Sequence, residues 1–188
     1  GVHRGYAPNY IRRVRFSSVD PLAKALLTIF GEENVHPENG QGDNLYAEGV
    51  DTWVFSFPIE TAAKIRAIDE SAISQLERYR LAQSCYTADG HNTSITVTVA
   101  PDEWNDVVEW VYDNWDYVIG VSFLPKYDPE VETYPQMPYE PCSVEVCNQL
   151  KELTPTFTEN ELIGLIAKYE DKYEEYEIID EACSTGAC

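Results

Sequence analysis

ITVTVAPDEWNDVVEWVYDNWDYVIGVSFL, residues 95–124, is the stretch of sequence that decides the fold. From 95 to 99, isoleucine and valine alternate with threonine, which is the two-residue period of a strand. Pro101 opens a helix, and its apolar side chains recur on one face: Trp104, Val107, Val108, Val111 and Trp115. Val118 to Leu124 is a second strand that Pro125 ends. This order predicts two parallel strands joined by a right-handed crossover helix.

Residues 50–57 predict a further strand of the same parallel sheet, because its aromatic side chains occupy alternate positions. The strand ends at Pro58, and Glu60-Thr61 leads directly into a long helix that ends near Cys85. The inward stripe of this helix is Ile73, Leu76 and either Tyr79 or Arg80. The predicted fold class is therefore α/β with parallel strands and crossover helices. Three strands make a thin sheet for 188 residues, so we expect part of a larger fold.

Two more helices are predicted toward the ends of the chain. Pro21 stands at a first helical position and Gly31 closes that helix, after which a polar loop runs to Gly49. A last helix begins at Thr158, whose hydroxyl caps it while Glu161 reaches back. Its apolar stripe is Leu162, Leu165, Ile166, Tyr169, Tyr173 and Tyr176.

Cysteines in the body of the chain are interpreted as packing residues. After a proline-rich segment, Cys142 and Cys147 flank the start of a short helix, and Cys85 ends a helix and is expected to be buried. The three histidines lie far apart in the sequence, and the cysteines lack a second ligand pair. We therefore expect no metal site.

Composition excludes several classes of function. The formal net charge of −20 argues against a nucleic-acid surface, although Arg4, Arg12, Arg13 and Arg15 form one basic cluster near the start. No hydrophobic run approaches bilayer length and no signal peptide is recognisable, so a membrane or secreted location has no support. Five cysteines, an odd number, fit the reducing cytoplasm.

The last six residues, Cys183-Ser-Thr-Gly-Ala-Cys188, place two thiols on a segment of small residues. Four turn-permissive residues let the two sulfur atoms meet without a preformed scaffold. Such a pair predicts a dithiol that reacts in one place and is reduced again in another. The alternative is an incidental pair of tail cysteines, and the residues alone do not decide between the two.

A second candidate is the turn formed by Ser56, Pro58, Ile59, Glu60 and Thr61. A buried strand that runs into a helix start presents free backbone N–H groups and the positive end of the helix dipole. Such a turn can hold a phosphate without any lysine. The alternative, an ordinary capped turn, is favoured on these residues alone, because every strand-to-helix turn offers some version of this geometry.

Seven blocks run in order along the chain: YIRRVR (10–15), WVFSFP (53–58), QLE (75–77), HNTSITV (91–97), VSFLP (121–125), YPQMPYE (134–140) and the terminal cysteine pair. Each block is weak alone. As an ordered set that covers nearly the whole chain, they resemble the carboxy-terminal part of the monomeric, adenosylcobalamin-dependent (class II) ribonucleoside-triphosphate reductases.

The resemblance implies the carboxy-terminal portion of a ten-stranded α/β barrel, incomplete on its own. Residues 1–141 would be the barrel segment, 142–177 a helical region and 178–188 a mobile dithiol tail. It also implies radical reduction of ribonucleotides to 2′-deoxyribonucleotides for DNA synthesis. Cys183 and Cys188 match the pair that thioredoxin regenerates. Ser56 to Thr61 falls where the family binds substrate phosphate, so the resemblance favours a phosphate-binding turn over an ordinary capped turn.

The departure from the family pattern is large. The thiyl cysteine, the first reducing pair and most residues that bind adenosylcobalamin belong to upstream parts that nothing here matches. We therefore expect this chain alone to be inactive, and to work with the amino-terminal remainder of the reductase, thioredoxin and a nucleoside triphosphate. The alternative is a stand-alone acidic α/β binding or thiol-relay module. Large aromatics that need partners, such as Trp53 and Phe123, favour the fragment.

Overall fold

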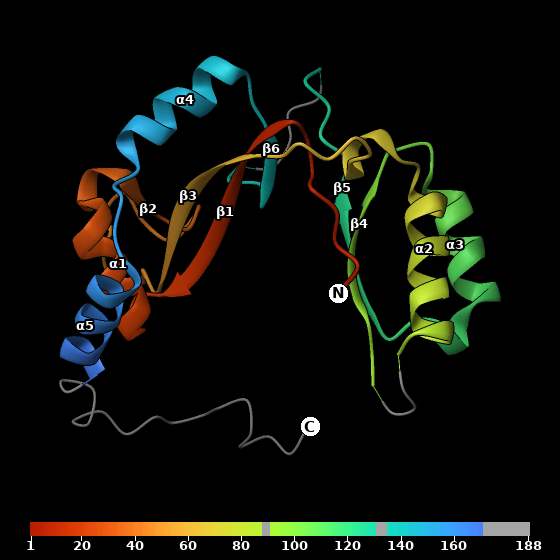
Figure 1. Cartoon of the computed structure of the whole chain (residues 1–188), viewed down its shortest axis with the longest axis horizontal. Helices are drawn as coiled ribbons and strands as arrows, with labels where there is room; N and C mark the ends of the chain where they lie inside the picture. The colour runs from red at the N-terminus through yellow and green to blue at the C-terminus, as the bar shows by residue number, and fades with distance from the viewer. Residues whose placement is uncertain (88–90, 131–134, 171–188) are drawn as a thin grey trace. The chain divides into compact units, whose positions relative to one another are not determined.

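The computed structural model describes residues 1–87, 91–130 and 135–170 (Figure 1). The chain divides into two compact units. The first unit contains Gly1–Arg13 and Phe57–Lys151, and the second contains Val14–Ser56 and the chain from Glu152 onward. Helices and strands occur in both, so the mixed α/β class is confirmed, whereas the ten-stranded barrel and the three sequence segments remain predictions.

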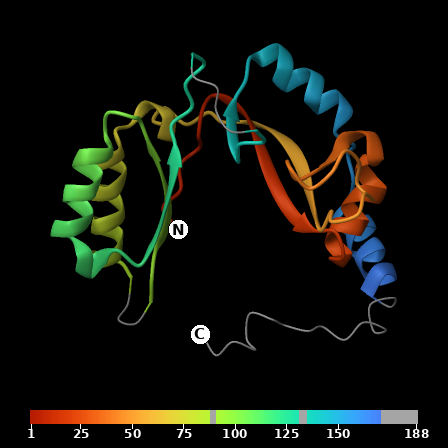
Figure 2. The ribbon, with the colours of Figure 1, turned by 180° about the vertical axis from the view of Figure 1, so that it is seen from behind.

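The first unit is built on the predicted strand–helix–strand order. Strand β4 (Ser94–Val99) pairs in parallel with β5 (Gly120–Pro125), and α3 (Trp104–Asp113) connects them. The register places Val97 opposite Phe123. Helix α2 (Ala72–Cys85) lies beside α3 on the same face of the two strands (Figure 2). The core between these layers consists of Ala72, Leu76, Tyr79, Ile95, Val97, Val99, Val107 and Trp110.

Helix α2 begins much later than the sequence predicts. Ser71 is its N-cap, because its hydroxyl accepts from the Ser74 N–H at 3.1 Å, and only the short 3₁₀ turn η2 (Ala67–Asp69) precedes it. The inward stripe is confirmed for Leu76 and Tyr79, which are fully buried. Of the two alternatives for its last position, Tyr79 is right and Arg80 is exposed. Helix α2 ends at Cys85 as predicted, but Cys85 is exposed, so its predicted burial is wrong.

The predicted inward face of helix α3 is confirmed for Val107 and Val111, which pack in or against the core, and is wrong for Val108 and Trp115. Val107 and Trp110 are buried, whereas Val108 is 65% exposed and Trp115, in the 3₁₀ turn η3 (Trp115–Tyr117), is 70% exposed. The indole N–H of Trp110 donates to the carboxylate of Glu77 on α2 at 2.7 Å, which fixes the inward position of Trp110. The outer face of α3 therefore carries large apolar side chains as well.

The strand near residue 55 does not join the parallel sheet, so the predicted three-stranded parallel sheet is wrong. Strand β3 (Thr52–Glu60) belongs to a four-stranded sheet of order β2-β3-β1-β6, with β2 (Val35–Pro37), β1 (Asn9–Ser17) and β6 (Tyr139–Pro141). The β2–β3 and β1–β6 pairs are antiparallel. The sequence analysis missed β2 and β6 because both are three-residue strands inside loop-like, proline- or glycine-rich segments.

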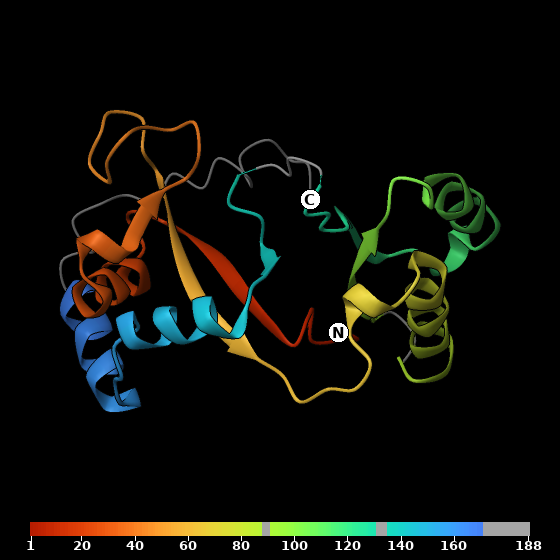
Figure 3. The ribbon, with the colours of Figure 1, turned by 90° about the horizontal axis from the view of Figure 1, so that it is seen from above.

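The second unit contains α1 (Pro21–Phe30), the 3₁₀ turn η1 (Glu32–Asn34) and α5 (Glu159–Glu170), and the two α-helices lie side by side (Figure 3). Both predicted starts are confirmed. Pro21 opens α1, and the Glu161 N–H donates to the hydroxyl of Thr158 at 3.3 Å while the Glu161 carboxylate accepts from the Thr158 N–H at 2.7 Å. Gly31 closes α1 with φ of 80°, a conformation that favours glycine.

Trp53 does not need a partner from elsewhere, which corrects one argument for the fragment. It is buried in the second unit, and its indole N–H donates to the carbonyl of Leu45 at 3.1 Å. Phe55 is likewise enclosed, with the rings of Phe16 and Phe30 edge-on to it. Phe123 in the first unit is partly buried against its core. Among the described residues, no helix is both long and apolar enough to span a membrane.

Helix α4 (Val144–Leu153) follows β6 after two residues. Cys142 precedes this helix and Cys147 lies in its first turns, so the prediction that the two cysteines flank the start of a short helix is confirmed. Cys147 is buried and Cys142 is half-buried.

Candidate functional site

The predicted phosphate turn is not a strand-to-helix turn. Ser56, Pro58, Ile59 and Glu60 all lie within β3, Thr61 follows it, and no α-helix begins until Ala72. The prediction that Pro58 ends the strand is therefore wrong, as is the expected helix dipole. Proline lacks a backbone N–H, so Pro58 removes one hydrogen-bond donor from the strand, and the residues after it continue the strand. A role for these residues in phosphate binding remains a prediction that must rest on other groups.

Polar groups at the end of β3 are largely committed to the fold. The Thr61 N–H donates to the carbonyl of Pro8 at 3.0 Å, and its hydroxyl accepts from the Ala63 N–H at 3.2 Å. The loop that follows carries Lys64, which is exposed, and Arg66, which pairs with Asp69 at 2.8 Å. Lys64 is the basic residue next to the predicted turn. It was not among the predicted site residues, because the prediction rested on free backbone N–H groups.

Helix α4 backs the end of β3. Lys151 Nζ lies 2.7 Å from the Glu60 carboxylate, and this hydrogen bond holds the pKa of Glu60 below its usual range. One turn earlier on the helix, the Cys147 thiol donates to the Ile59 carbonyl at 3.9 Å. An ionised Glu60 repels a phosphate, so Lys151 is the group that neutralises this position.

Two further blocks of the resemblance meet in a polar clasp, which we define as Arg12, Arg13, Tyr139 and Glu140. The Arg12 guanidinium lies 4.3 Å from the centre of the Tyr139 ring. Arg13 donates to the carbonyl of Met137 at 3.1 Å and pairs with the Glu140 carboxylate. These contacts add to the β1–β6 pairing, where Ile11 lies opposite Glu140. Arg12 and Arg13, which the sequence shows only as part of a basic cluster, therefore have contacts within the fold.

Gln75 joins α2 to β4 at the centre of the first unit. Its side-chain amide accepts from the Thr98 N–H at 3.2 Å and donates to the Thr98 hydroxyl at 3.0 Å. Both residues are buried. A buried amide that satisfies its donor and acceptor groups in this way fixes the register of helix against strand. The block around Gln75 therefore has a structural role.

A small cavity lies beside this network in the first unit, lined by residues that include His3, Arg4, Gln75, Arg78 and Tyr139. Its volume is about 20 Å³, enough for one water molecule. Within the described residues, the buried Nε of Arg78 has no hydrogen-bond acceptor, although its Nη1 pairs with the Glu70 carboxylate. Burial lowers the pKa of His3. The cavity is large enough for one water molecule and too small for a nucleotide.

The other candidate residues lie elsewhere in the chain. Cys183 and Cys188 fall outside the described residues, so the tail pair stays a prediction from sequence. In the described part of the chain, no group of three or more histidine, cysteine or acidic side chains is arranged to hold a metal ion.

Comparison with known proteins finds two relatives by sequence and one solved structure that aligns with the chain. No protein-family model matches the chain. An adenosylcobalamin-dependent ribonucleoside-triphosphate reductase of Levilactobacillus brevis is 25% identical over 192 residues, which cover all of this chain and 24% of that protein. A Mycobacterium phage D29 protein, provisionally given the same name, is 24% identical over 205 residues, all of this chain and 25% of that protein.

The two homologues of this chain are named as adenosylcobalamin-dependent ribonucleoside-triphosphate reductases. The chain spans about a quarter of the length of these reductases. The crystal structure of a B12-dependent (class II) ribonucleotide reductase aligns with 93% of this chain and 22% of that chain, at 21% identity and a TM-score of 0.49. The two sequence matches confirm the predicted resemblance to part of such a reductase.

Adenosylcobalamin is far larger than the cavity of about 20 Å³ in the first unit. The residues around that cavity do not fit the cofactor. The homologous reductases depend on it, but no chemical step through it is derived from the residues of this chain.

Proposed function

We propose that this chain is the carboxy-terminal segment of a cytoplasmic, adenosylcobalamin-dependent ribonucleoside-triphosphate reductase, and that it works only together with the remaining part of that enzyme. The observation that carries the proposal is the match of the whole chain to about a quarter of two reductases. Exposed apolar side chains support it, namely Val108 on α3 and Trp115 in η3, because such side chains are usually covered in a larger assembly.

In this proposal Cys183 and Cys188 relay reducing equivalents from thioredoxin. A thiolate of the pair attacks the disulfide left in the active site and forms a mixed disulfide. The second tail thiol then attacks that bond, which releases the reduced active site and leaves Cys183–Cys188 oxidised. Tethering supplies a high local concentration of thiol. Asp180 and Glu181 are like charges next to the pair, so the relay depends on reach more than on unusual thiol acidity.

The relay is tested with Cys183→Ser in the reductase at its native length. Turnover with thioredoxin should be lost, while turnover with a small dithiol that reaches the active site directly should remain. Cys85→Ser is the matched control, because Cys85 is exposed but lies on α2, and it should leave both activities unchanged. Equal loss with both reductants in Cys183→Ser would contradict the relay.

For the substrate, we propose that the end of β3, from Ser56 to Thr61, contacts the phosphates of the nucleoside triphosphate, with the exposed Lys64 as counter-charge. Loss of one charge-assisted hydrogen bond predicts that Lys64→Gln raises KM for the substrate by roughly tenfold and leaves kcat unchanged. The control is Lys24→Gln on α1, which should change neither constant. An unchanged KM in Lys64→Gln would remove this residue from the site.

A further inference from the structure

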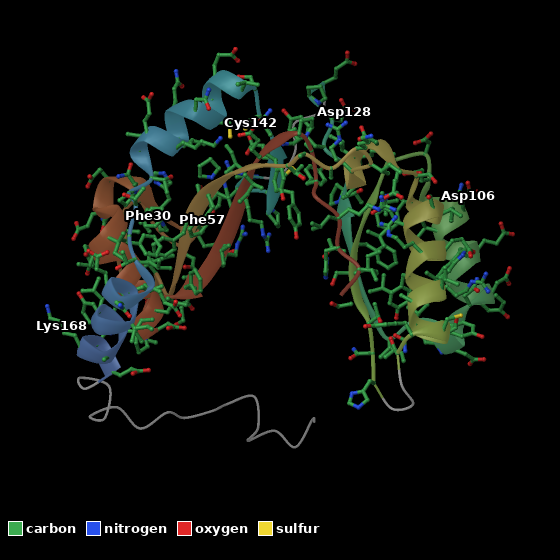
Figure 4. The ribbon with its side chains drawn as sticks, viewed as in Figure 1. Phe30, Phe57, Asp106, Asp128, Cys142 and Lys168 are labelled. Atoms are coloured by element: carbon green, nitrogen blue, oxygen red, sulfur yellow. The ribbon has the colours of Figure 1, made fainter. Side chains whose placement is uncertain are left out.

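A second pair of cysteines, with the same spacing as the tail pair, brackets the start of α4 (Figure 4). Ser143 is the N-cap of this helix, because its hydroxyl accepts from the Val146 N–H at 3.3 Å and its carbonyl from the Cys147 N–H at 3.0 Å. Cys142 therefore stands just before the cap and Cys147 at the fourth helical position. Side chains at these two positions pack against one another in the arrangement known as a hydrophobic staple.

The two thiols differ in access but interact directly. Cys147 is only 1% exposed, and its thiol reaches the carbonyl of Ile59. Cys142 is half-buried, and its backbone N–H is held by the carbonyl of Asn9 at 3.1 Å. Burial raises the pKa of Cys142, and the charge and hydrogen bond of the neighbouring Cys147 thiol raise it further, as does the Glu140 carboxylate. The side chains of Cys142 and Cys147 are therefore neighbours at the start of α4.

We propose that Cys142 and Cys147 are a second oxidisable dithiol, in which Cys142 reacts with a small disulfide and Cys147 resolves the product into an intramolecular disulfide. The assignment follows from the staple, which brings the two sulfur atoms together, and from their unequal exposure. It does not rest on the proposed function, because it concerns the start of α4 alone.

The chemistry is ordinary thiol–disulfide exchange. The Cys142 thiolate attacks one sulfur of a small disulfide and expels a thiolate, which leaves a mixed disulfide on Cys142. Cys147 then attacks the Cys142 sulfur and expels the second small thiolate, which takes up the Cys147 proton and leaves as a thiol. The two cysteines are oxidised by two electrons, and the small disulfide is reduced to two thiols. Because the second attack is intramolecular, the oxidant never has to reach the buried Cys147.

Oxidation would change the contact between α4 and β3. In the disulfide, Cys147 has no S–H group, so its hydrogen bond to the Ile59 carbonyl is lost. The two sulfur atoms must also close to a bond length of about 2.0 Å. Lys151 lies one turn further along and pairs with Glu60, the residue after Ile59. The redox state of the pair is thereby coupled to the end of β3.

The test uses the protein at its native length, with Cys183→Ser and Cys188→Ser to remove the tail pair, and bis(2-hydroxyethyl) disulfide as oxidant. Trypsin releases residues 127–151 as one peptide that contains both cysteines. The expected product is this peptide with two hydrogen atoms fewer, without the hydroxyethyl group and resistant to alkylation. A stable hydroxyethyl adduct on Cys142 with a free Cys147 would overturn the proposal, and so would two unmodified thiols.

Two single-cysteine variants separate the role of Cys142, which reacts with the oxidant, from that of Cys147, which resolves the mixed disulfide. Cys147→Ser should stop the reaction at the mixed disulfide on Cys142, and Cys142→Ser should leave Cys147 unmodified because no oxidant reaches it. Cys85→Ser is the control and should still form the disulfide. Hydrogen exchange of the Glu60 and Thr61 amides should increase on oxidation of the unsubstituted pair, and unchanged exchange there would overturn the coupling to β3.

Discussion

Two parts of the first unit are held together in different ways. The β4–α3–β5 layer is formed from a continuous run of sequence and is held by buried apolar side chains against α2. The polar clasp joins Arg13 to groups more than a hundred positions away, such as the Met137 carbonyl, 124 positions along the chain. In the first unit, then, local hydrophobic packing forms the β4–α3–β5 layer, whereas charged and aromatic side chains join segments that lie far apart in the sequence.

The largest effect is expected in the apolar layer. Leu76 is fully buried between α2 and β4, so Leu76→Ala should lower the free energy of unfolding by about 2–5 kcal/mol. Hydrogen exchange of the β4 and β5 amides measures this locally. Leu81→Ala on the same helix is the control, because Leu81 is exposed, and it should change stability by less than about 0.5 kcal/mol. Similar effects of the two changes would mean that this layer is not the stabilising core.

A smaller effect is expected in the clasp. Arg13 is 16% exposed, and Arg13→Gln removes its pairing with Glu140 and its bond to the Met137 carbonyl. We expect a loss of about 1–2 kcal/mol, seen as faster exchange of the amides that pair β1 with β6, while β4 keeps its protection. A double-mutant cycle with Glu140→Gln isolates the pair. Loss of protection in β4 as well would erase the distinction between the two parts.

The smallest effect is expected at the surface pair of Glu60 and Lys151. Lys151→Met should let the pKa of Glu60 rise toward its ordinary value, because the hydrogen bond that lowers it is gone. A lowered carboxyl pKa contributes stability above the unfolded pKa that is lost as the pH falls through the folded pKa. Both groups are exposed, so the unfolding midpoint at neutral pH should not change measurably. Carboxyl NMR titration checks the shift, and an unchanged Glu60 pKa would contradict the pairing.

The same comparison explains what the sequence could predict. The period of residues 95–99 and the apolar spacing of α3 identify two strands and a helix, because these patterns arise from near neighbours. The inward position of Trp110 on α3 was missed because it depends on the hydrogen bond from Trp110 to Glu77, a contact between two helices. The pairing of β1 with β6 was missed because three residues around Tyr139 carry no strand pattern of their own.

The candidate site was predicted less well than the fold. Ser56 lies in a strand as predicted, but the helix expected after Thr61 begins only at Ala72, because Ser71 supplies the N-cap. The contact of Cys147 with Ile59 joins segments 88 positions apart, and no local pattern signals it. The tail cysteines could be recognised only by their small neighbours and by resemblance.

The central claim is that this chain works as about a quarter of a reductase, and the mass of the native particle tests it most directly. The particle is isolated from the source cells under non-denaturing conditions and followed through a peptide such as Trp104–Lys126. We expect a particle with a mass of about four times 21.4 kDa, either one long chain or two associated chains. A particle of 21.4 kDa that contains no other polypeptide would contradict it.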